Sequence, residues 1–122
     1  MKYDGGKLRF DLIDGMAEAE LVAVLTYGAV KYDAENWRKV DDAENRYFAA
    51  LRRHLDAFRR RDEQVDPESG LHHLAHAAAC LHFMLALAAE RHPALAESFD
   101  NRLARALETA RAMKEKRQPT SE

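Results

Sequence analysis

Four histidines fall close together in one segment of the chain: His72, His73, His76 and His82. The residues from Leu74 to Ala89 are apolar almost all the way round, which is typical of a helix buried on most sides. Buried imidazoles normally need a partner, and imidazole is a good ligand for transition ions. The segment therefore indicates either a metal site or core histidines that are hydrogen-bonded to backbone or carboxylate groups.

A third imidazole and two carboxylates complete the candidate metal site. His54 lies on the inward stripe of a second predicted helix, which should run antiparallel beside the histidine-rich one. We therefore place His54, His73 and His76 near the ion. Glu68 is a further candidate ligand, and Asp56 and Glu68 are the catalytic candidates. Glu68 precedes His73 by about 7 Å along a helix axis, so it serves either a second ion or only the helix dipole.

Cationic side chains could hold the phosphates of a substrate. The candidates are Lys7, Arg9, Lys31, Arg46 and Arg53. Arg46 and Arg53 are seven residues apart and share one helical face. The Gly-Gly-Lys at residues 5–7 is not a P-loop, because the full spacing and the preceding strand are absent. The run Arg59–Arg61 is read as a solvated face.

Aromatic and amide side chains near residues 27–37 could recognise a purine base. Tyr27, Asn36 and Trp37 could stack on the base and hydrogen-bond to it. The alternative for Trp37 is a residue at the rim that covers one end of a helical bundle. Neither a Gly-x-Ser-x-Gly motif nor a zinc-finger spacing occurs, which disfavours covalent acyl chemistry and a structural zinc site.

The elements that must position these groups are predicted to be helices. Apolar spacing predicts helices over about 16–32, 43–61 and 66–92, and a fourth from Pro93. Asp66 should cap the third helix, with Pro67 at its first position and Glu68 near its dipole. Residues 1–14 are expected to form an extended arm and 114–122 a frayed tail. The prediction is one all-α domain over residues 1–122, built as a four-helix bundle.

Composition limits the classes of partner. The 122 residues carry a formal net charge of −2, which disfavours nucleic acid as a partner. The single cysteine, Cys80, and an N-terminus without an apolar segment favour a cytoplasmic protein with no membrane association. The third helix is too apolar to be covered by three neighbours, so we expect a homo-oligomer, either a dimer or a tetramer.

Four stretches of the chain carry a family resemblance: KYDGGKLRFDLI, LTYGAVKYDAENWRKV, RYFAALRRHLDAF and DPESGLHHLAHAAACLHF. Together they resemble the phage-borne dATP/dGTP diphosphohydrolase N-terminal domain family over roughly residues 2–88. That family is related to the MazG-like all-α nucleoside triphosphate pyrophosphohydrolases. The resemblance implies a MazG-like bundle that hydrolyses a purine (d)NTP, dGTP, GTP or dATP, to the monophosphate and pyrophosphate. It implies a role in remodelling the nucleotide pool of a phage-infected cell.

The chain departs from the more distant MazG-like pattern at the metal site. Where that pattern has Glu-Glu-x-x-Glu, this chain has Arg52, Arg53 and Asp56, and His73 and His76 fall within one residue of a Glu-x-x-Asp pair. Either the site is rebuilt with histidines and other carboxylates, or the activity is lost. The expected cofactor is Mg²⁺ or Mn²⁺, with an ion like Co²⁺ or Zn²⁺ as the alternative for a histidine-rich site.

Two other functional classes remain open from the sequence. One is a metal-dependent phosphohydrolase that releases tripolyphosphate or orthophosphate. The other is a non-catalytic helical assembly module in which the histidines are structural. The partner expected for the pyrophosphohydrolase is a small molecule, a purine nucleoside triphosphate.

Overall fold

The computed structural model describes residues 8–117 of the chain. Its elements in chain order are the 3₁₀ helix η1 (Phe10–Leu12), α1 (Gly15–Lys31), the 3₁₀ helix η2 (Asn36–Lys39), α2 (Ala43–Arg59), α3 (His73–Arg91), α4 (Pro93–Glu97) and α5 (Phe99–Arg117). Within this described range, pairing between extended segments is limited to one isolated bridge, between Val65 and His72. The predicted all-α class is confirmed, whereas the four-helix bundle and its oligomeric assembly stay predictions.

The first helix begins and ends where its end groups are satisfied. Asp14 precedes α1, and its carboxylate accepts a hydrogen bond from the amide of Ala17 at 2.9 Å. Glu18 in the first turn and Lys31 in the last turn both complement the helix dipole. The predicted helix over 16–32 is therefore right to within one residue at each end.

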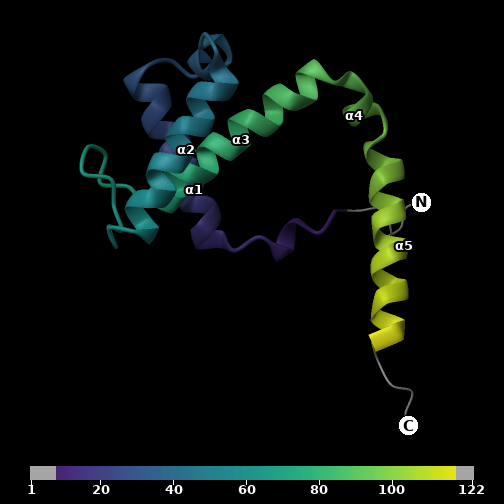
Figure 1. Cartoon of the computed structure of the whole chain (residues 1–122). Helices are drawn as coiled ribbons and strands as arrows, with labels where there is room; N and C mark the ends of the chain where they lie inside the picture. Colours follow the sequence, from purple (N-terminus) through teal and green to yellow (C-terminus); the bar gives the residue numbers. More distant parts are fainter. Residues whose placement is uncertain (1–7, 118–122) are drawn as a thin grey trace. The chain divides into compact units, whose positions relative to one another are not determined.

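Small residues on α3 let two other helices pack closely against it. Val24 of α1 packs with Ala75 and Ala79 in one buried cluster. Leu51 of α2 packs with Ala77 and Cys80 in a second cluster. Figure 1 shows α1, α2 and the first part of α3 side by side. The N-terminal half of α3 is thus the shared wall between α1 and α2.

The start of α3 corrects the prediction of a helix from Asp66. The helix begins at His73. Residues 66–72 form a turn in which Asp66 Oδ1 accepts hydrogen bonds from the backbone amides of Glu68 and Ser69. The Nδ1 of His72 accepts the amide of Leu74 at 2.9 Å, so an imidazole caps the helix in place of a carboxylate. Asp66 therefore caps a turn, and Glu68 lies outside the helix dipole.

A narrow hairpin between α2 and α3 explains why the helix starts late. The amide of Asp66 donates to the carbonyl of Leu71 at 2.8 Å, and the amide of His73 donates to that of Gln64 at 2.8 Å. Gly70 has φ +75°, a conformation that the hairpin requires and that a helix forbids. The chain therefore folds back on itself here, which returns residues 63–66 to the first turn of α3.

The chain divides into two compact units, one ending at Leu87 and the other beginning at Ala88. In the second unit the single predicted helix is two helices, α4 and α5, separated at Ser98. The guanidinium of Arg102 donates to the carbonyl of Leu95 and to Ser98 Oγ, which fixes this break. The single-domain organisation of residues 1–122 stays a prediction.

The predicted arm and tail are also revised. Residues 10–12 form a 3₁₀ turn, which does not fit an extended arm, and Phe10 is 76% exposed. Helix α5 continues to Arg117, so residues 114–117 are helical and not frayed. The rest of the arm and of the tail, residues 1–7 and 118–122, lies outside the described residues.

Among the described helices, α3 is long and apolar enough to cross a membrane by length and composition. A core helix has the same composition, and α3 packs against α1 and α2 as a core helix does. Leu74, Leu81 and Leu85 of α3 are 40%, 53% and 73% exposed. These three residues lie seven and four apart, so they form one apolar stripe that the rest of the first unit leaves uncovered.

Candidate active site

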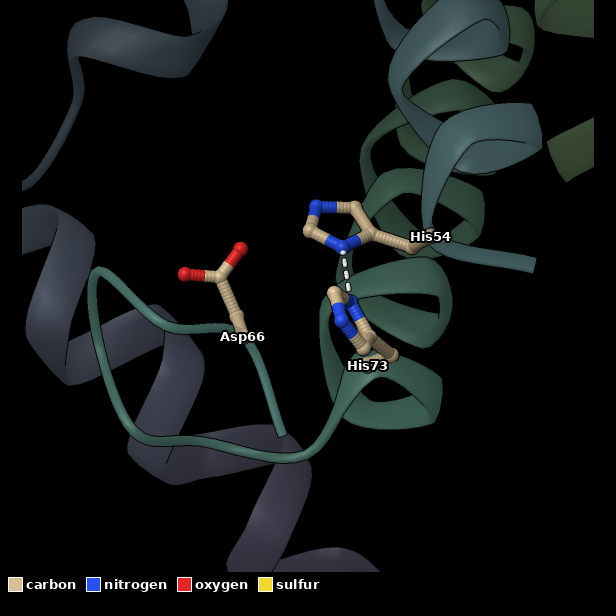
Figure 2. Close-up of side chains that lie close together, drawn as sticks. All are labelled: His54, Asp66 and His73. Carbon is tan, nitrogen blue, oxygen red and sulfur yellow. Dashed lines mark hydrogen bonds between the residues drawn. The ribbon is translucent and has the colours of Figure 1, made fainter. Parts of the chain in front are cut away.

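Two histidines and an aspartate converge at the hairpin between α2 and α3. One potential ligand atom from each of His54, Asp66 and His73 lies within 4.8 Å of the other two. The Nδ1 atoms of His54 and His73 are 2.9 Å apart. Figure 2 shows the two rings meeting at these nitrogens, with Asp66 reaching up from the hairpin beside them. We call these three residues the HHD cluster.

A carboxylate behind the HHD cluster fixes the protonation of His73. Glu63 Oε1 is 2.9 Å from His73 Nε2, and a carboxylate can only accept, so Nε2 carries the proton. In the neutral ring Nδ1 then holds a lone pair, which accepts from the Nδ1–H of His54. The chain of hydrogen bonds therefore runs from His54 through His73, which is only 3% exposed, to Glu63.

Burial keeps His54 neutral and backbone hydrogen bonds keep Asp66 ionised, which are the states that a metal ion requires. Burial, and then the neighbouring His76 and His73, lower the pKa of His54 to about 4, so its ring is neutral at physiological pH. Burial raises the pKa of Asp66, but the amides of Ser69 and Glu68 outweigh it, and the net pKa is lowered. The cluster thus offers neutral imidazole and an ionised carboxylate.

His76 extends the cluster along one face of α3. Its ring stacks on His54 with centroids 4.6 Å apart and planes 9° from parallel. Its Nε2 lies 2.8 Å from Ser69 Oγ, which also accepts the amide of Leu71 at 3.0 Å. Burial lowers the pKa of His76 as well. His76 therefore ties the helix to the hairpin and lies against the HHD cluster.

The HHD cluster has the chemistry of a site for a divalent ion. Nitrogen ligands lie about 2.1 Å from such an ion, so two Nδ1 atoms 2.9 Å apart can reach the same one once His54 carries its proton on Nε2 in place of Nδ1. The Nε2–H···carboxylate bond from His73 to Glu63 is the outer contact that a metal-binding imidazole usually makes. Two nitrogens and one carboxylate suit manganese-, cobalt- or zinc-like ions better than magnesium, which prefers oxygen.

A cavity of about 940 Å³ opens beside the cluster, and α1, η2, α2, the hairpin and α3 all contribute to its wall. Most of the residues predicted for chemistry line it: Tyr27, Lys31, Asn36, Trp37, Arg46, Arg53, His54, Glu68 and His76. Asp66 also lines it, while His73 lies behind His54. Imidazole, carboxylate, cationic and aromatic side chains therefore share one chamber large enough for a nucleotide.

On the cationic side of the cavity, an ion pair joins α1 to the hairpin. Lys31 Nζ of α1 is 2.5 Å from Glu68 Oε2 of the hairpin, and Tyr27 donates to the same oxygen. The hydrogen bond from Lys31 and then that from Tyr27 lower the pKa of Glu68. Arg46 and Arg53 of α2 line the same cavity. Glu68 thus forms an ion pair with Lys31, a cation that a phosphate could also bind.

The aromatic side of the cavity is already packed internally. Trp37 stacks on Phe83 with centroids 4.8 Å apart, and the guanidinium of Arg38 lies 4.2 Å from the Trp37 ring centroid. Tyr47 donates to the carbonyl of Trp37 at 2.9 Å, which anchors η2 to α2. Asn36 precedes Trp37 in the cavity wall. Trp37 is therefore a structural part of the cavity wall, whether or not it also contacts a base.

Three predicted residues are placed elsewhere or lie beyond the described range. Asp56 pairs with Arg60 at 3.8 Å and is absent from the cavity wall. Arg9 pairs with Asp11 at 2.8 Å and is also absent from the wall. Lys7 lies outside the described residues.

Two acidic residues, one in the HHD cluster and one beside it, have no such role in the sequence-based prediction. Asp66 was assigned only to a helix cap, and Glu63 was assigned nothing. Both depend on the hairpin, since Glu63 meets a histidine ten residues further along the chain. The Ser69-Gly70 pair is the local hint that a turn precedes the helix.

Comparison with known proteins gives the chain its relatives. It is 37% identical over 86 residues to a dATP/dGTP diphosphohydrolase of Salmonella phage PMBT28. The match covers 69% of this chain but only 28% of that relative, so the chain spans less than a third of its length. No solved structure matches the chain. The family model described as dATP/dGTP diphosphohydrolase, N-terminal, matches residues 1–97. The chain therefore belongs to the dATP/dGTP diphosphohydrolase N-terminal family.

Proposed function

We propose that this chain hydrolyses a purine nucleoside triphosphate, dATP, dGTP or GTP, between the α- and β-phosphates with the help of a divalent ion. The observation that supports this most is the shared cavity. His54 and Asp66 of the HHD cluster and the cations Lys31, Arg46 and Arg53 all border one space of about 940 Å³. The name of the phage relative supports the same class of nucleotide hydrolysis.

The donor set decides which ion is proposed. His73 Nδ1, a carboxylate oxygen of Asp66, and His54 Nδ1 with its proton moved to Nε2 would hold the ion. Mn²⁺, Co²⁺ or Zn²⁺ fits two nitrogen ligands better than Mg²⁺. A bound ion would neutralise charge on the triphosphate and activate an attacking water. His76, stacked against His54, keeps the second face of that ring from solvent.

The cationic residues have a separate role in this proposal. Arg46 and Arg53 bind the β- and γ-phosphates and stabilise the negative charge that develops on the departing pyrophosphate. Lys31 joins them when the substrate's phosphate competes with Glu68 for the ammonium group. Glu68 is thereby freed to accept a proton near the reacting phosphate. Asp56 and Arg9 receive no role.

Base recognition is assigned to the aromatic side of the cavity. Tyr27 and Asn36 offer hydrogen-bonding groups, while Trp37, held by Phe83, provides a rigid aromatic surface.

The expected oligomer remains part of the proposal, because Leu74, Leu81 and Leu85 leave an apolar stripe on α3. The substrate pool that we propose is that of the cytoplasm.

The experiment is an assay of the purified chain with dATP, dGTP, GTP, dCTP and dTTP, each with Mg²⁺, Mn²⁺, Co²⁺ or Zn²⁺. Products are separated by chromatography, so that pyrophosphate, orthophosphate and tripolyphosphate are distinguished. We expect monophosphate and pyrophosphate from purine substrates, with Mn²⁺ or Co²⁺ more effective than Mg²⁺. His54→Ala and Asp66→Asn should each reduce turnover at least 100-fold, and His92→Ala, an exposed histidine of the second unit, should not.

The other outcomes are informative in specific ways. Release of tripolyphosphate or orthophosphate would assign the chain to another class of phosphohydrolase. Full turnover in His54→Ala or His73→Ala would remove the HHD cluster from the site while leaving the activity intact. Failure of every ion and every nucleotide to raise the melting temperature would favour an assembly module with structural histidines.

A further inference from the structure

The most specific contact around the HHD cluster is made by a residue outside the cavity wall. Glu63 stands in the hairpin four residues beyond the end of α2 and accepts a hydrogen bond from His73 Nε2 at 2.9 Å. His73 is 3% exposed, so water cannot take over that role easily. Arg61 donates to the same oxygen of Glu63 at 3.3 Å, which holds the carboxylate from its outer side.

An imidazole has two tautomers, and only one of them can serve the cluster. With the proton on Nε2, the lone pair of His73 is on Nδ1 and faces Nδ1 of His54. With the proton on Nδ1, His73 would present a donor to the cluster and could not bind an ion through that nitrogen. The choice between the two depends on what Nε2 meets, and among the described residues it meets Glu63.

We propose that Glu63 is a positioning residue that fixes His73 as the Nε2–H tautomer and thereby directs its Nδ1 lone pair into the HHD cluster. The inference rests on the proposed function for its purpose, because the lone pair matters once an ion is bound. The tautomer itself is a property of the protein without an ion. The two ideas can therefore be tested separately.

The hairpin explains how Glu63 reaches His73. The amide of Glu63 donates to the carbonyl of Ala57 at 2.9 Å, which continues the last turn of α2, and Asp62 then adopts φ +54°. The amide of His73 donates to the carbonyl of the next residue, Gln64, at 2.8 Å. Backbone hydrogen bonds on both sides thus hold the carboxylate opposite the ring, independently of the side-chain contact.

The first test is nitrogen NMR of ¹⁵N-labelled protein in EDTA, which reads the tautomer of each histidine directly. In the wild type, His73 should show a protonated Nε2 and an unprotonated Nδ1. Glu63→Ala should give an average of the two tautomers. Glu63→Gln should keep the wild-type signature, since its amide oxygen can still accept from Nε2. Glu108→Ala, which removes an equal charge from an exposed position of α5, should leave the spectrum of His73 unchanged.

The second test is the affinity for Co²⁺ alone, measured by titration calorimetry and by the visible absorption of the bound ion. Loss of such an outer contact typically weakens binding 10- to 100-fold, which is the change expected for Glu63→Ala. Glu63→Gln should lose less than Glu63→Ala, and Glu108→Ala nothing.

These two readouts separate the possible failures. A wild-type His73 protonated at Nδ1, or a tautomer that Glu63→Ala leaves unchanged, overturns the inference whatever the activity. A wild type with the expected tautomer that binds no ion overturns the proposed function and the purpose assigned to Glu63. If Glu63→Ala fails to fold by circular dichroism, Glu63→Leu, which also lacks an acceptor, takes its place, and a wild-type tautomer retained in that folded variant overturns the inference equally.

Discussion

His54 is the residue on which the candidate site depends most directly. It comes from the inward face of α2, meets His73 through one nitrogen and stacks on His76 with its ring. Three imidazoles so close together cannot all be protonated without strong repulsion. The packing around His54 therefore selects neutral rings, which are the form that binds metal ions.

This packing predicts how stability depends on pH in the ion-free protein. The pKa of His54 is about 4 in the folded state and 6.5 as its ordinary value, with His76, His73, Asp66 and Arg53 as the charged or titratable neighbours. The unfolded chain therefore binds more protons between these two values. Stability from this group is complete above pH 6.5 and is lost progressively as the pH falls from 6.5 to 4.

The measurement is urea unfolding in EDTA at pH 7.5 and pH 5. We expect the His54 contribution to fall by about 1 to 2 kcal/mol between these values. His54→Gln, which cannot titrate, should lose that much less stability than the wild type over the same range. His92→Gln, at an exposed position, should behave as the wild type does. Equal pH slopes for His54→Gln and the wild type would contradict the prediction.

The sequence predicted which residues belong to the site better than it predicted which side chains they contact. The sequence singles out His54, His73 and Lys31 by residue type and by place on the predicted helices, and the structure places them in or against one cavity wall. Glu63 and Asp66 were missed as members of the site because their partners lie across a hairpin. A carboxylate in a loop looks like any solvated charge until the backbone that directs it is known.

The hairpin between α2 and α3 is the element that determines the site. It supplies Glu63, Asp66 and Glu68, and it moves the start of α3 from residue 66 to His73. Pro67 and the acidic residues beside it fit a helix start in every local respect, and the sequence-based prediction followed them. The backbone pairing of Val65 with His72 overrides that local preference.

Gly70 gives a direct test of the hairpin. It has φ +75°, and a β-carbon there would meet nothing within 4 Å, so any cost of Gly70→Ala is conformational and not steric. We expect a loss of about 1 kcal/mol in the free energy of unfolding, measured in urea. Affinity for Co²⁺ should fall with it, because Asp66 is held by the same turn.

A second glycine serves as the matched control for this change. Gly28 lies inside α1, also with open space where a β-carbon would be. Alanine favours a helix interior, so Gly28→Ala should raise stability by about 0.5 to 1 kcal/mol. Two glycine-to-alanine changes of opposite sign are thus expected. A stabilising effect of Gly70→Ala would show that the hairpin does not need its left-handed residue.

At the scale of the whole molecule, the apolar surface of α3 predicts self-association. Leu81 and Leu85 are 53% and 73% exposed, and Phe48 of α2 is 48% exposed. Burial of such side chains is worth about 1.5 to 3 kcal/mol each. We therefore expect the chain to sediment as a dimer or tetramer at micromolar concentrations.

The double variant Leu81→Glu/Leu85→Glu tests this surface, because a carboxylate there would be costly to bury. Analytical ultracentrifugation should show a monomer that keeps its helical circular dichroism. Val30→Glu, at an 83% exposed position of α1, should keep the wild-type mass. A wild-type mass that is monomeric and independent of concentration would contradict the prediction.

The overall fold followed from the sequence as far as local patterns could determine it. The helical class, α1 and α2 were predicted to within about two residues, because apolar spacing and end groups act locally. The separation of α4 from α5 was not predicted, since it depends on Arg102 reaching back to Leu95. The assembly of the helices involves contacts that no single segment encodes.

The hairpin also makes the HHD cluster and its immediate partners a local structure in the sense of contact order. The side-chain hydrogen bonds that join His54, His73, Glu63, Ser69 and His76 span 19, 10 and 7 residues. Contacts this short close small loops at low entropic cost and form early in folding. The stretch from His54 to His76 can therefore keep its geometry when the surrounding sequence changes in length. That independence suits a chain whose phage relative is more than three times the length of the region the two share.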